Sequence, residues 1–274
     1  MTDALADFLW HHRDVVAVQI TQVRGSAPRE NGAAMYVAQD GFYGTIGGGQ
    51  VEYMAIDHAR QMLRSGRAQD QMNVPLGPEI GQCCGGFVRI DLNVMDDTAR
   101  KTATQDQQQV AESWPHVLIF GAGHVGRALA QALRPLPFQT RLIDSRVAEL
   151  AMDGSGIAQT LTPLPEAEVA AAPPNAAYVV LTHDHALDFL IASQALARGD
   201  AAYVGMIGSA TKRARFASFC RDTDGPDPAA LVCPIGASPI PDKRPEVIAA
   251  MVTAELVGVL LKDAALTTVK ENVG

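Results

Sequence analysis

Hydrophobic and polar residues alternate in several short runs of the first hundred positions, which is the pattern of half-buried strands. Apolar residues spaced three and four apart predict helices near Asp3–Arg13 and from Val51 to a glycine stop at Gly66. The expected strands are Val15–Val23, Ala34–Ala38, Phe42–Ile46 and Phe87–Val94. The turn QDG between the second and third of these favours a hairpin. Residues 1–95 are therefore predicted to form an N-terminal α+β domain.

The pattern changes at residues 96–113, where Val110 is the only large apolar residue. This composition predicts a polar linker. Beyond it, apolar runs (HVLIF, TRLID, AYVVLT, YVGMIG and LVCPIG) alternate with helical patterns up to a closing helix that begins near Pro245. Such alternation is typical of a parallel sheet with crossover helices. Residues 114–274 are thus predicted to form a Rossmann-like, doubly wound domain with a C-terminal helix, so the fold class is α/β.

Charge and composition exclude several classes of partner. The chain has 274 residues with 22 Lys+Arg against 30 Asp+Glu, a formal net charge of −8, which argues against nucleic acid or an anionic membrane surface as the ligand. No basic N-terminal segment precedes an apolar run, and no stretch of about eighteen apolar residues occurs. The expected location is the cytoplasm, where the four cysteines would remain reduced. Homodimerisation is plausible, although no heptad pattern supports it.

A glycine-rich turn joins the strand HVLIF to the helix that follows it. Gly121, Gly123 and Gly126 stand at the spacing that lets backbone N–H groups at a helix start approach a phosphate, and His124 lies among them. Asp144 ends the next strand, eighteen residues past Gly126, where an acid would meet a ribose hydroxyl. The alternative is a turn that only packs the helix on the strand. Nearby Arg146 could equally pair with a phosphate or a carboxylate.

Three further segments carry candidate binding groups. The loop TIGGGQ, with Gly47, Gly48 and Gly49, is a second glycine-rich entry to a helix and a possible anion nest. THDHALD, which contains His183, follows a predicted strand and suggests either zinc binding, helix capping by its first aspartate, or cofactor contact. A third helix start carries Ser209 and Lys212, where a bound anion would explain the basic residue. Solvated loops or faces are the alternatives.

The segment EIGQCCGG places Cys83 beside Cys84. Adjacent Cα atoms lie about 3.8 Å apart, below the usual disulfide range, so a bond between them would be strained. The pair also lacks the two-residue spacer of zinc knuckles. A thiolate in a glycine-rich loop is suited to one bond with a soft metal, while small thiols that merely fill a turn are the alternative.

Six segments in this order (RGSAPRENGAAM, GTIGGGQVE, GPEIGQCCGG, VLIFGAGHVGRAL, THDHALD and YVGMIGSATKRARF) resemble the XdhC/CoxI family over nearly the whole chain. The resemblance implies an accessory protein, not a turnover enzyme. It implies that the protein binds molybdenum cofactor while a cysteine desulfurase adds the terminal sulfido ligand, and then delivers it to apo-xanthine dehydrogenase, within purine metabolism. Cys83 and Cys84 become the candidate molybdenum contacts, and the turn at Gly121–Gly126 would hold a pterin phosphate or a nucleotide.

A rival hypothesis is an NAD-dependent oxidoreductase that uses Asp144 for the ribose and His183 or His185 for proton transfer. No Lys–Tyr or His–Asp arrangement in the sequence supports it. The choice between the two hypotheses depends on which cofactor the glycine turn binds.

Overall fold

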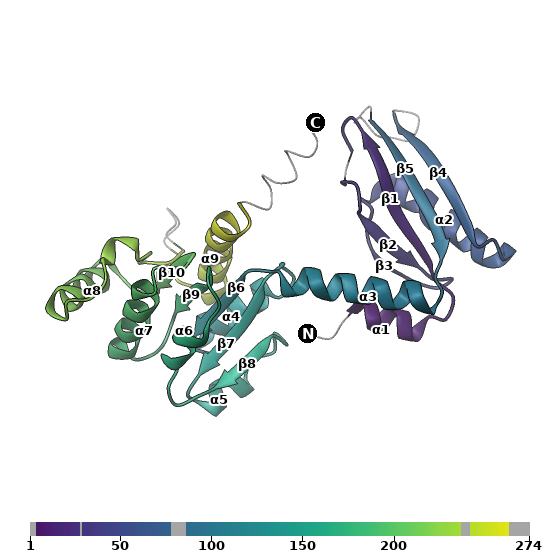
Figure 1. Ribbon diagram of the computed structural model, residues 1–274. Coiled ribbons are helices and arrows are strands. Elements are labelled where there is room, and N and C mark those ends of the chain that lie inside the picture. Colours follow the sequence, from purple (N-terminus) through teal and green to yellow (C-terminus); the bar gives the residue numbers. More distant parts are fainter. Residues whose placement is uncertain (1–3, 28, 78–85, 237–241, 263–274) are drawn as a thin grey trace. The chain divides into compact units, whose positions relative to one another are not determined.

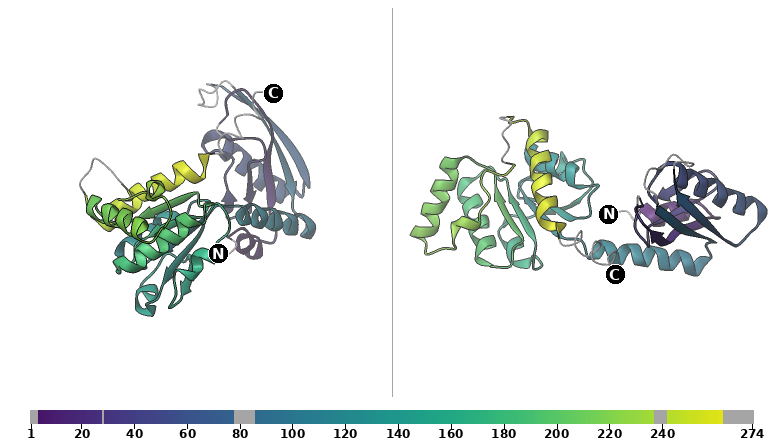
Figure 2. Two further views of the ribbon diagram at one scale, coloured as in Figure 1. Left: turned by 60° about the vertical axis from the view of Figure 1, so that its left-hand side comes forward. Right: turned by 90° about the horizontal axis from the view of Figure 1, so that it is seen from above.

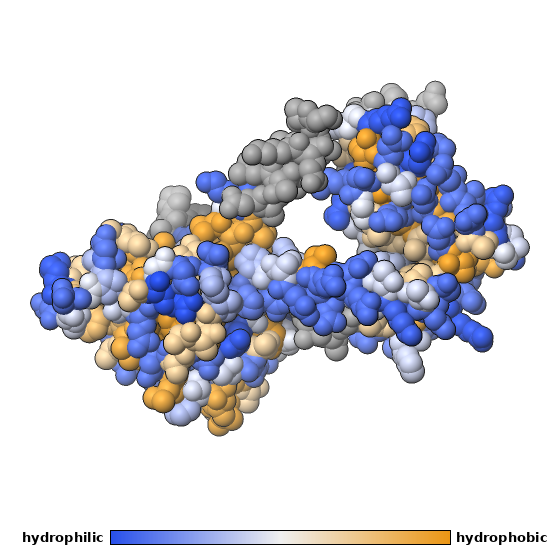
Figure 3. Space-filling view, in the orientation of Figure 1, coloured by the Kyte–Doolittle hydropathy of each residue, from blue (hydrophilic) through white to orange (hydrophobic). Residues whose placement is uncertain are grey.

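The computed structural model describes residues 4–27, 29–77, 86–236 and 242–262 (Figure 1). The chain divides into two compact units between residues 109 and 110. This division falls within the predicted polar linker, which forms helix α3 (Asp97–Glu112) and has no buried residue. The surface over α3 is mainly hydrophilic (Figure 3). Because the helix lacks an apolar face, its sequence carries no helical period, and composition alone indicated only a connection.

The N-terminal unit is built on a five-stranded antiparallel sheet with the strand order β3-β2-β1-β5-β4. Helix α2 covers one of its faces (Figures 1 and 2), and the buried side chains of that helix pack on the strands. The predicted hairpin is present, with Tyr36 opposite Tyr43. The elements are α1 (Ala4–His11), β1 (Val16–Arg24), β2 (Ala34–Val37), β3 (Phe42–Gly44), α2 (Gly49–Ser65), β4 (Gln69–Leu76) and β5 (Gly86–Val94).

The second unit contains a five-stranded parallel sheet with the order β10-β9-β6-β7-β8. From β6 the chain moves outward to β7 and β8, then returns to β9 on the other side of β6. The carboxyl ends of β6 and β9 therefore form the topological switch point at which doubly wound sheets bind ligands. The strands are β6 (His116–Phe120), β7 (Gln139–Asp144), β8 (Ala158–Leu161), β9 (Ala177–Val180) and β10 (Tyr203–Met206).

Helices cover both faces of this sheet, which confirms the predicted Rossmann-like class. Helices α4 and α9 lie on one face of the sheet and α6, α7 and α8 on the other (Figures 1 and 2). Each set of helices packs on the sheet through its own buried core. The helices are α4 (His124–Leu133), α5 (Val147–Ala151), α6 (Ala167–Ala171), α7 (His185–Ala197), α8 (Ala210–Asp222) and α9 (Pro245–Leu260), with a short 3₁₀ turn at Pro228–Ala230. In the described parts of the chain, no helix combines the length and apolar character needed to cross a bilayer.

Two parts of the second unit differ from expectation. The segment LVCPIG was expected to form the fifth and last strand of this unit, but only Val232 makes an isolated bridge, to Gly205. The Cys233–Pro234 peptide that follows is cis, and proline has no N–H to extend a ladder. Strand β8 was not predicted because most of its residues are exposed, so it lacks the apolar run that identifies the central strands.

Candidate functional site

The turn between β6 and α4 places three glycines in three different environments. A Cβ on Gly121, whose φ is +113°, would lie 2.4 Å from the carbonyl oxygen of Leu181. A Cβ on Gly126 would lie 1.9 Å from the carbonyl oxygen of Gly121. A Cβ on Gly123, the residue before α4, would meet no heavy atom within 4 Å. The outer glycines therefore permit close packing, while the middle one leaves the first turn of α4 open to approach by a ligand.

His124 is the first residue of α4 and is exposed. It borders a groove of about 490 Å³ between α4 and α9, which Arg127 and Glu246 also line. Most of the remaining lining is alanine and proline. The volume is within the range of small-molecule sites, so the open helix start has space beside it.

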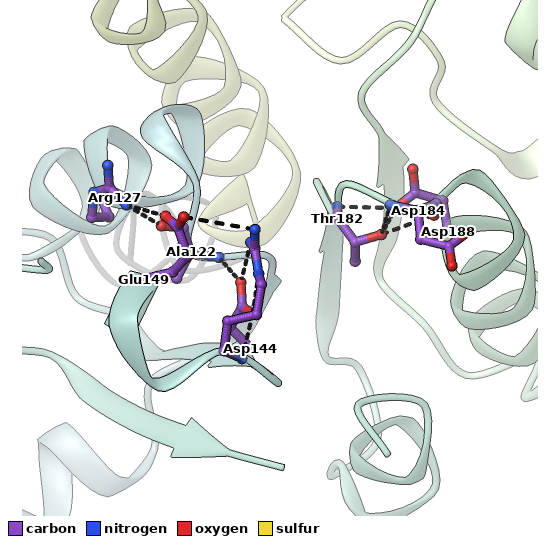
Figure 4. Close-up of polar contacts among 8 residues, drawn as sticks. Ala122, Arg127, Asp144, Glu149, Thr182, Asp184 and Asp188 are labelled. Carbon is purple, nitrogen blue, oxygen red and sulfur yellow. Dashed lines mark hydrogen bonds and ion pairs between the residues drawn. The ribbon is translucent and has the colours of Figure 1, made fainter. Parts of the chain in front are cut away.

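Asp144 lies at the end of β7, beside the glycine turn as predicted, and is 5% exposed. Its carboxylate accepts a hydrogen bond from the N–H of Ala122 at 2.7 Å (Figure 4). It accepts another from the N–H of Arg146 at 2.8 Å. The Arg146 guanidinium adds two more, from Nε at 3.0 Å and Nη2 at 2.9 Å. Burial raises the pKa of Asp144, but these hydrogen bonds outweigh it and hold the pKa below its usual value. The acid is thus fully engaged within the protein.

Ion pairs next to Asp144 connect the glycine turn to the first residues of α5. Arg127 Nη1 donates to the carbonyl oxygen of Ala122 at 2.6 Å and to Glu149 at 2.7 Å (Figure 4). Glu149 also approaches the guanidinium of Arg146 at 3.7 Å. Neither Arg127 nor Glu149 was predicted from the sequence. The only available signal was an arginine one turn into the helix and an acid three residues after Arg146.

The THDHALD segment forms the turn from β9 into α7. Asp184 caps α7 by accepting from the N–H groups of Ala186 and Leu187, which confirms the capping interpretation. The Thr182 hydroxyl donates to Asp188 at 2.6 Å, and the Thr182 N–H donates to the same carboxylate at 3.0 Å (Figure 4). Both aspartates of the segment are therefore used for structure.

Lys212 is buried and pairs with Asp188, which has no exposed surface. Its ammonium also donates to the carbonyl oxygen of Ile207 at 2.9 Å. Ser209 caps α8 by accepting from the N–H of Lys212. The expectation that a bound anion explains this lysine is corrected: the buried carboxylate of Asp188 is its partner.

The arrangement of the THDHALD side chains gives no support to the zinc interpretation. His183 and His185 are exposed, while the aspartates beside them are occupied by the cap and the ion pair. Among the residues that the structure describes, no group of three His, Cys, Asp or Glu side chains is arranged to hold a metal ion.

The switch point itself contains little free space. A cavity of about 10 Å³ lies there, and residues at the carboxyl ends of β6, β7 and β9 line it, including Gly121, Asp144, Thr182 and His183. This volume is that of about one water molecule. His183 and Asp144, both candidate cofactor-binding residues, thus line the same small cavity.

The N-terminal glycine loop is filled by a carboxylate of its own helix. Gly47, Gly48 and Gly49 all have positive φ angles, of 122°, 74° and 68°. Glu52 accepts from the N–H groups of Ile46 at 3.0 Å and Gly48 at 3.1 Å, and from the hydroxyl of Thr45. A nest exists here as the glycines suggested, but a second anion would have to displace Glu52.

The N-terminal unit brings two loops and the start of β5 to the same end of its sheet. Strands β1 and β3 run in one direction, so the RGSAPRENG and TIGGGQ loops both begin toward one end of the sheet. Strand β5 enters at this end, where Gly86 pairs with Leu76. A Cβ on Gly86 would lie 2.2 Å from the carbonyl oxygen of Ser26. The start of β5 therefore contacts the first of these loops directly.

The candidate metal ligands Cys83 and Cys84 lie outside the described residues. Cys220 and Cys233 are buried, and burial raises the pKa of both thiols. Such thiols are poor metal ligands and nucleophiles. The cysteine hypothesis therefore still depends on the adjacent pair.

The fold and turns define a Rossmann-type domain that follows an antiparallel α+β domain. Comparison with family models matches residues 117–256 to the XdhC Rossmann domain and residues 9–74 to the XdhC and CoxI family. The chain belongs to the XdhC and CoxI family, as the sequence motifs predicted.

Two relatives illustrate the range of this likeness. An uncharacterised Escherichia coli (strain K12) protein, YqeB, is 30% identical over 129 residues, which cover 46% of this chain and 21% of YqeB. The matched region thus spans about a fifth of that relative. A Bacillus halodurans crystal structure that is named a xanthine dehydrogenase superposes with a TM-score of 0.77 over 96% of both chains at 18% identity. At that identity the similarity establishes the fold alone.

Proposed function

We propose that this protein is a maturation factor that binds molybdenum cofactor and delivers it to apo-xanthine dehydrogenase. The observation that carries the proposal is the open start of α4 at Gly123, in a chain of the XdhC and CoxI family. A molybdopterin phosphate needs several N–H donors and room for its close approach. Gly123 provides the room, and the first turn of α4 provides the donors.

The rest of the α4 environment suits a ligand of this kind. The groove that begins at His124 is large enough for an organic group, and Arg127 adds a positive charge at its edge. Arg127 is already bonded to Ala122 and Glu149, so its role would be to hold the turn. The bound cofactor would supply the molybdenum centre that receives the sulfido ligand. Cys83 or Cys84 is our proposed contact to that metal, since a thiolate suits a soft metal.

The proposed partners follow from the family. Xanthine dehydrogenase is the expected client, in keeping with the name of the Bacillus halodurans structure, and a cysteine desulfurase is the expected source of sulfur. In this role the protein holds and transfers a cofactor and has no turnover reaction of its own. A homodimer is part of the proposal only if transfer of the cofactor requires two copies of this protein.

The test is to purify the full chain from cells that make molybdenum cofactor and to assay bound pterin and molybdenum. Gly123→Val should lower retained pterin about tenfold or more, because its side chain would occupy the phosphate approach. Gly154→Val is the matched control, since a Cβ there also meets no heavy atom within 4 Å. Cys83→Ala and Cys84→Ala, made separately, should lower molybdenum more than pterin.

Two results would contradict the proposal. One is wild-type protein without pterin or molybdenum, together with normal xanthine dehydrogenase activity in a strain that lacks the protein. The other is equal pterin retention by Gly123→Val and Gly154→Val, which would place the phosphate away from α4.

A further inference from the structure

In Rossmann domains that bind dinucleotides, the acid at the end of the second strand accepts hydrogen bonds from the adenosine ribose. Asp144 occupies that position, at the end of β7. A carboxylate has about four acceptor positions. Here Ala122 and Arg146 supply four hydrogen bonds to it, two on each oxygen. No position is left for a ribose hydroxyl unless the Arg146 side chain moves away.

An aspartate and an arginine two residues apart also pair elsewhere in the chain, so burial distinguishes this case. Asp242 and Arg244 form the same kind of fork before α9, with side chains 23% and 74% exposed. The Asp144 side chain is 4% exposed and is also bonded to the glycine turn. Water could take the place of Arg244 at Asp242, because that fork is exposed. At Asp144, the loss of Arg146 would leave a buried charge short of partners.

The space around Asp144 agrees with its hydrogen bonding. The cavity it shares with Gly121, Thr182 and His183 has room for about one water molecule, far less than a nucleoside needs. Gly123, in contrast, faces open space. The turn can therefore be approached by a phosphate from the α4 side, while the adenosine position is closed.

We propose that Arg146 is a specificity-determining residue that occupies the ribose position and excludes NAD, whose adenosine ribose would need the acceptor positions of Asp144. The ligand class that remains is a phosphate monoester whose organic part carries no ribose diol at this place. This inference rests on the proposed function, because the pterin phosphate of molybdenum cofactor is a ligand of that class. It also argues against an NAD-dependent oxidoreductase, because such an enzyme would need the hydrogen bonds between the ribose and Asp144 that Arg146 replaces.

The test is titration of the full chain with NADH and with ADP-ribose, followed by calorimetry and NADH fluorescence. The wild type should show no binding at ligand concentrations up to the millimolar range. Arg146→Ala frees one acceptor position on each oxygen of Asp144, so its affinity should rise about ten- to hundredfold, the value of hydrogen bonds to a charged group. Adding Asp144→Asn to this variant should remove the gain.

Arg244→Ala is the matched control: it breaks the same kind of fork at an exposed turn and should bind neither ligand. If Arg146→Ala does not fold, Arg146→Gln replaces the guanidinium with a shorter, uncharged polar side chain and should show a smaller gain in affinity. Tight NADH binding by the wild type overturns the inference without any variant. It is equally overturned if no folded Arg146 variant gains affinity.

Pterin content of the same wild-type preparation separates this inference from the proposed function. A preparation without pterin that still excludes NADH contradicts only the maturation role. A preparation that holds pterin and also binds NADH contradicts only the role of Arg146.

Discussion

The two glycine-rich loops look alike in sequence and differ in what fills them. Both lead into a helix, and both place backbone N–H groups around the first turn of that helix. In the N-terminal loop, Glu52 from the following helix accepts hydrogen bonds from the N–H groups of Ile46 and Gly48. In the Rossmann loop, Ala122 donates its N–H to Asp144, whose other hydrogen bonds come from Arg146, and Gly123 faces open space. The N-terminal loop is occupied by a carboxylate of the protein itself, and the Rossmann loop has room for an anionic ligand.

The difference shows that a glycine pattern predicts the shape of a nest but not its occupant. The occupant is decided by a carboxylate elsewhere in the chain and by the direction in which it points. Glu52 lies one turn into its own helix and turns back over the loop, much as in a capping box. The corresponding residue of α4 is Arg127, a cation, which binds a carbonyl oxygen instead.

The largest expected effect separates the glycines within the Rossmann loop. Gly126→Ala should lower the free energy of unfolding by more than about 3 kcal/mol or prevent folding, because its Cβ would lie 1.9 Å from a backbone oxygen. Gly123→Ala should cost less than about 1 kcal/mol, the difference between glycine and alanine before a helix. Urea denaturation of the two variants beside the wild type measures both.

This prediction fails if the two substitutions cost the same. Gly154→Ala, at another glycine with no neighbour within 4 Å, provides the baseline for an open position. A Gly123→Ala variant as unstable as Gly126→Ala would mean that the start of α4 is packed and has no room for a phosphate.

The next effect concerns the loop that is already filled. Glu52→Ala leaves the N–H groups of Ile46 and Gly48 without their acceptor, which should cost about 1–2 kcal/mol in the free energy of unfolding. Sulfate or inorganic phosphate should then bind the vacated nest and restore part of the loss, at concentrations that leave the wild type unchanged. Thermal melting with and without sulfate measures this.

Glu246→Ala is a suitable control, since Glu246 also lies in the first turn of its helix, α9. If sulfate stabilises Glu52→Ala no more than it stabilises Glu246→Ala, the loop is not an anion nest. Equal sulfate binding by the wild type would show that Glu52 does not fill it.

The central parts of the fold could be predicted because burial leaves a periodic pattern. Strands β6 and β9 are buried almost throughout, and α2 ends at Gly66 with the left-handed conformation that glycine favours. Strand β4 was missed because it is a polar edge strand, and α3 because it has no buried residue. Both depend on neighbours that a single sequence does not reveal.

The candidate site was predictable only as a set of positions. Sequence spacing placed Asp144 beside the glycine turn and Asp184 at a helix start, where the structure has them. It did not reveal that Asp188 would pair with Lys212, because the two residues are 24 positions apart. Nor did it reveal which partner Arg146 would choose. Hydrogen-bond partners are set by the tertiary structure, so a list of site residues overstates how many are free to bind a ligand.

The smallest expected effect is a pH dependence that belongs to Asp144. Its pKa in the folded protein is below the ordinary value of 3.8, although burial opposes this, because Arg146 and Ala122 donate to the carboxylate. The ionised carboxylate therefore stabilises the fold above that ordinary value, and the contribution is lost as the pH falls through the lower, folded pKa. The difference in unfolding free energy between the wild type and Asp144→Asn should be constant near neutral pH and narrow in acid. When both proteins also carry Arg146→Gln, which removes the guanidinium that holds the carboxylate, the difference between them should narrow less. A wild-type difference that does not vary between about pH 7 and pH 3 would mean that solvent, not Arg146, surrounds Asp144, and the ribose position would then be open.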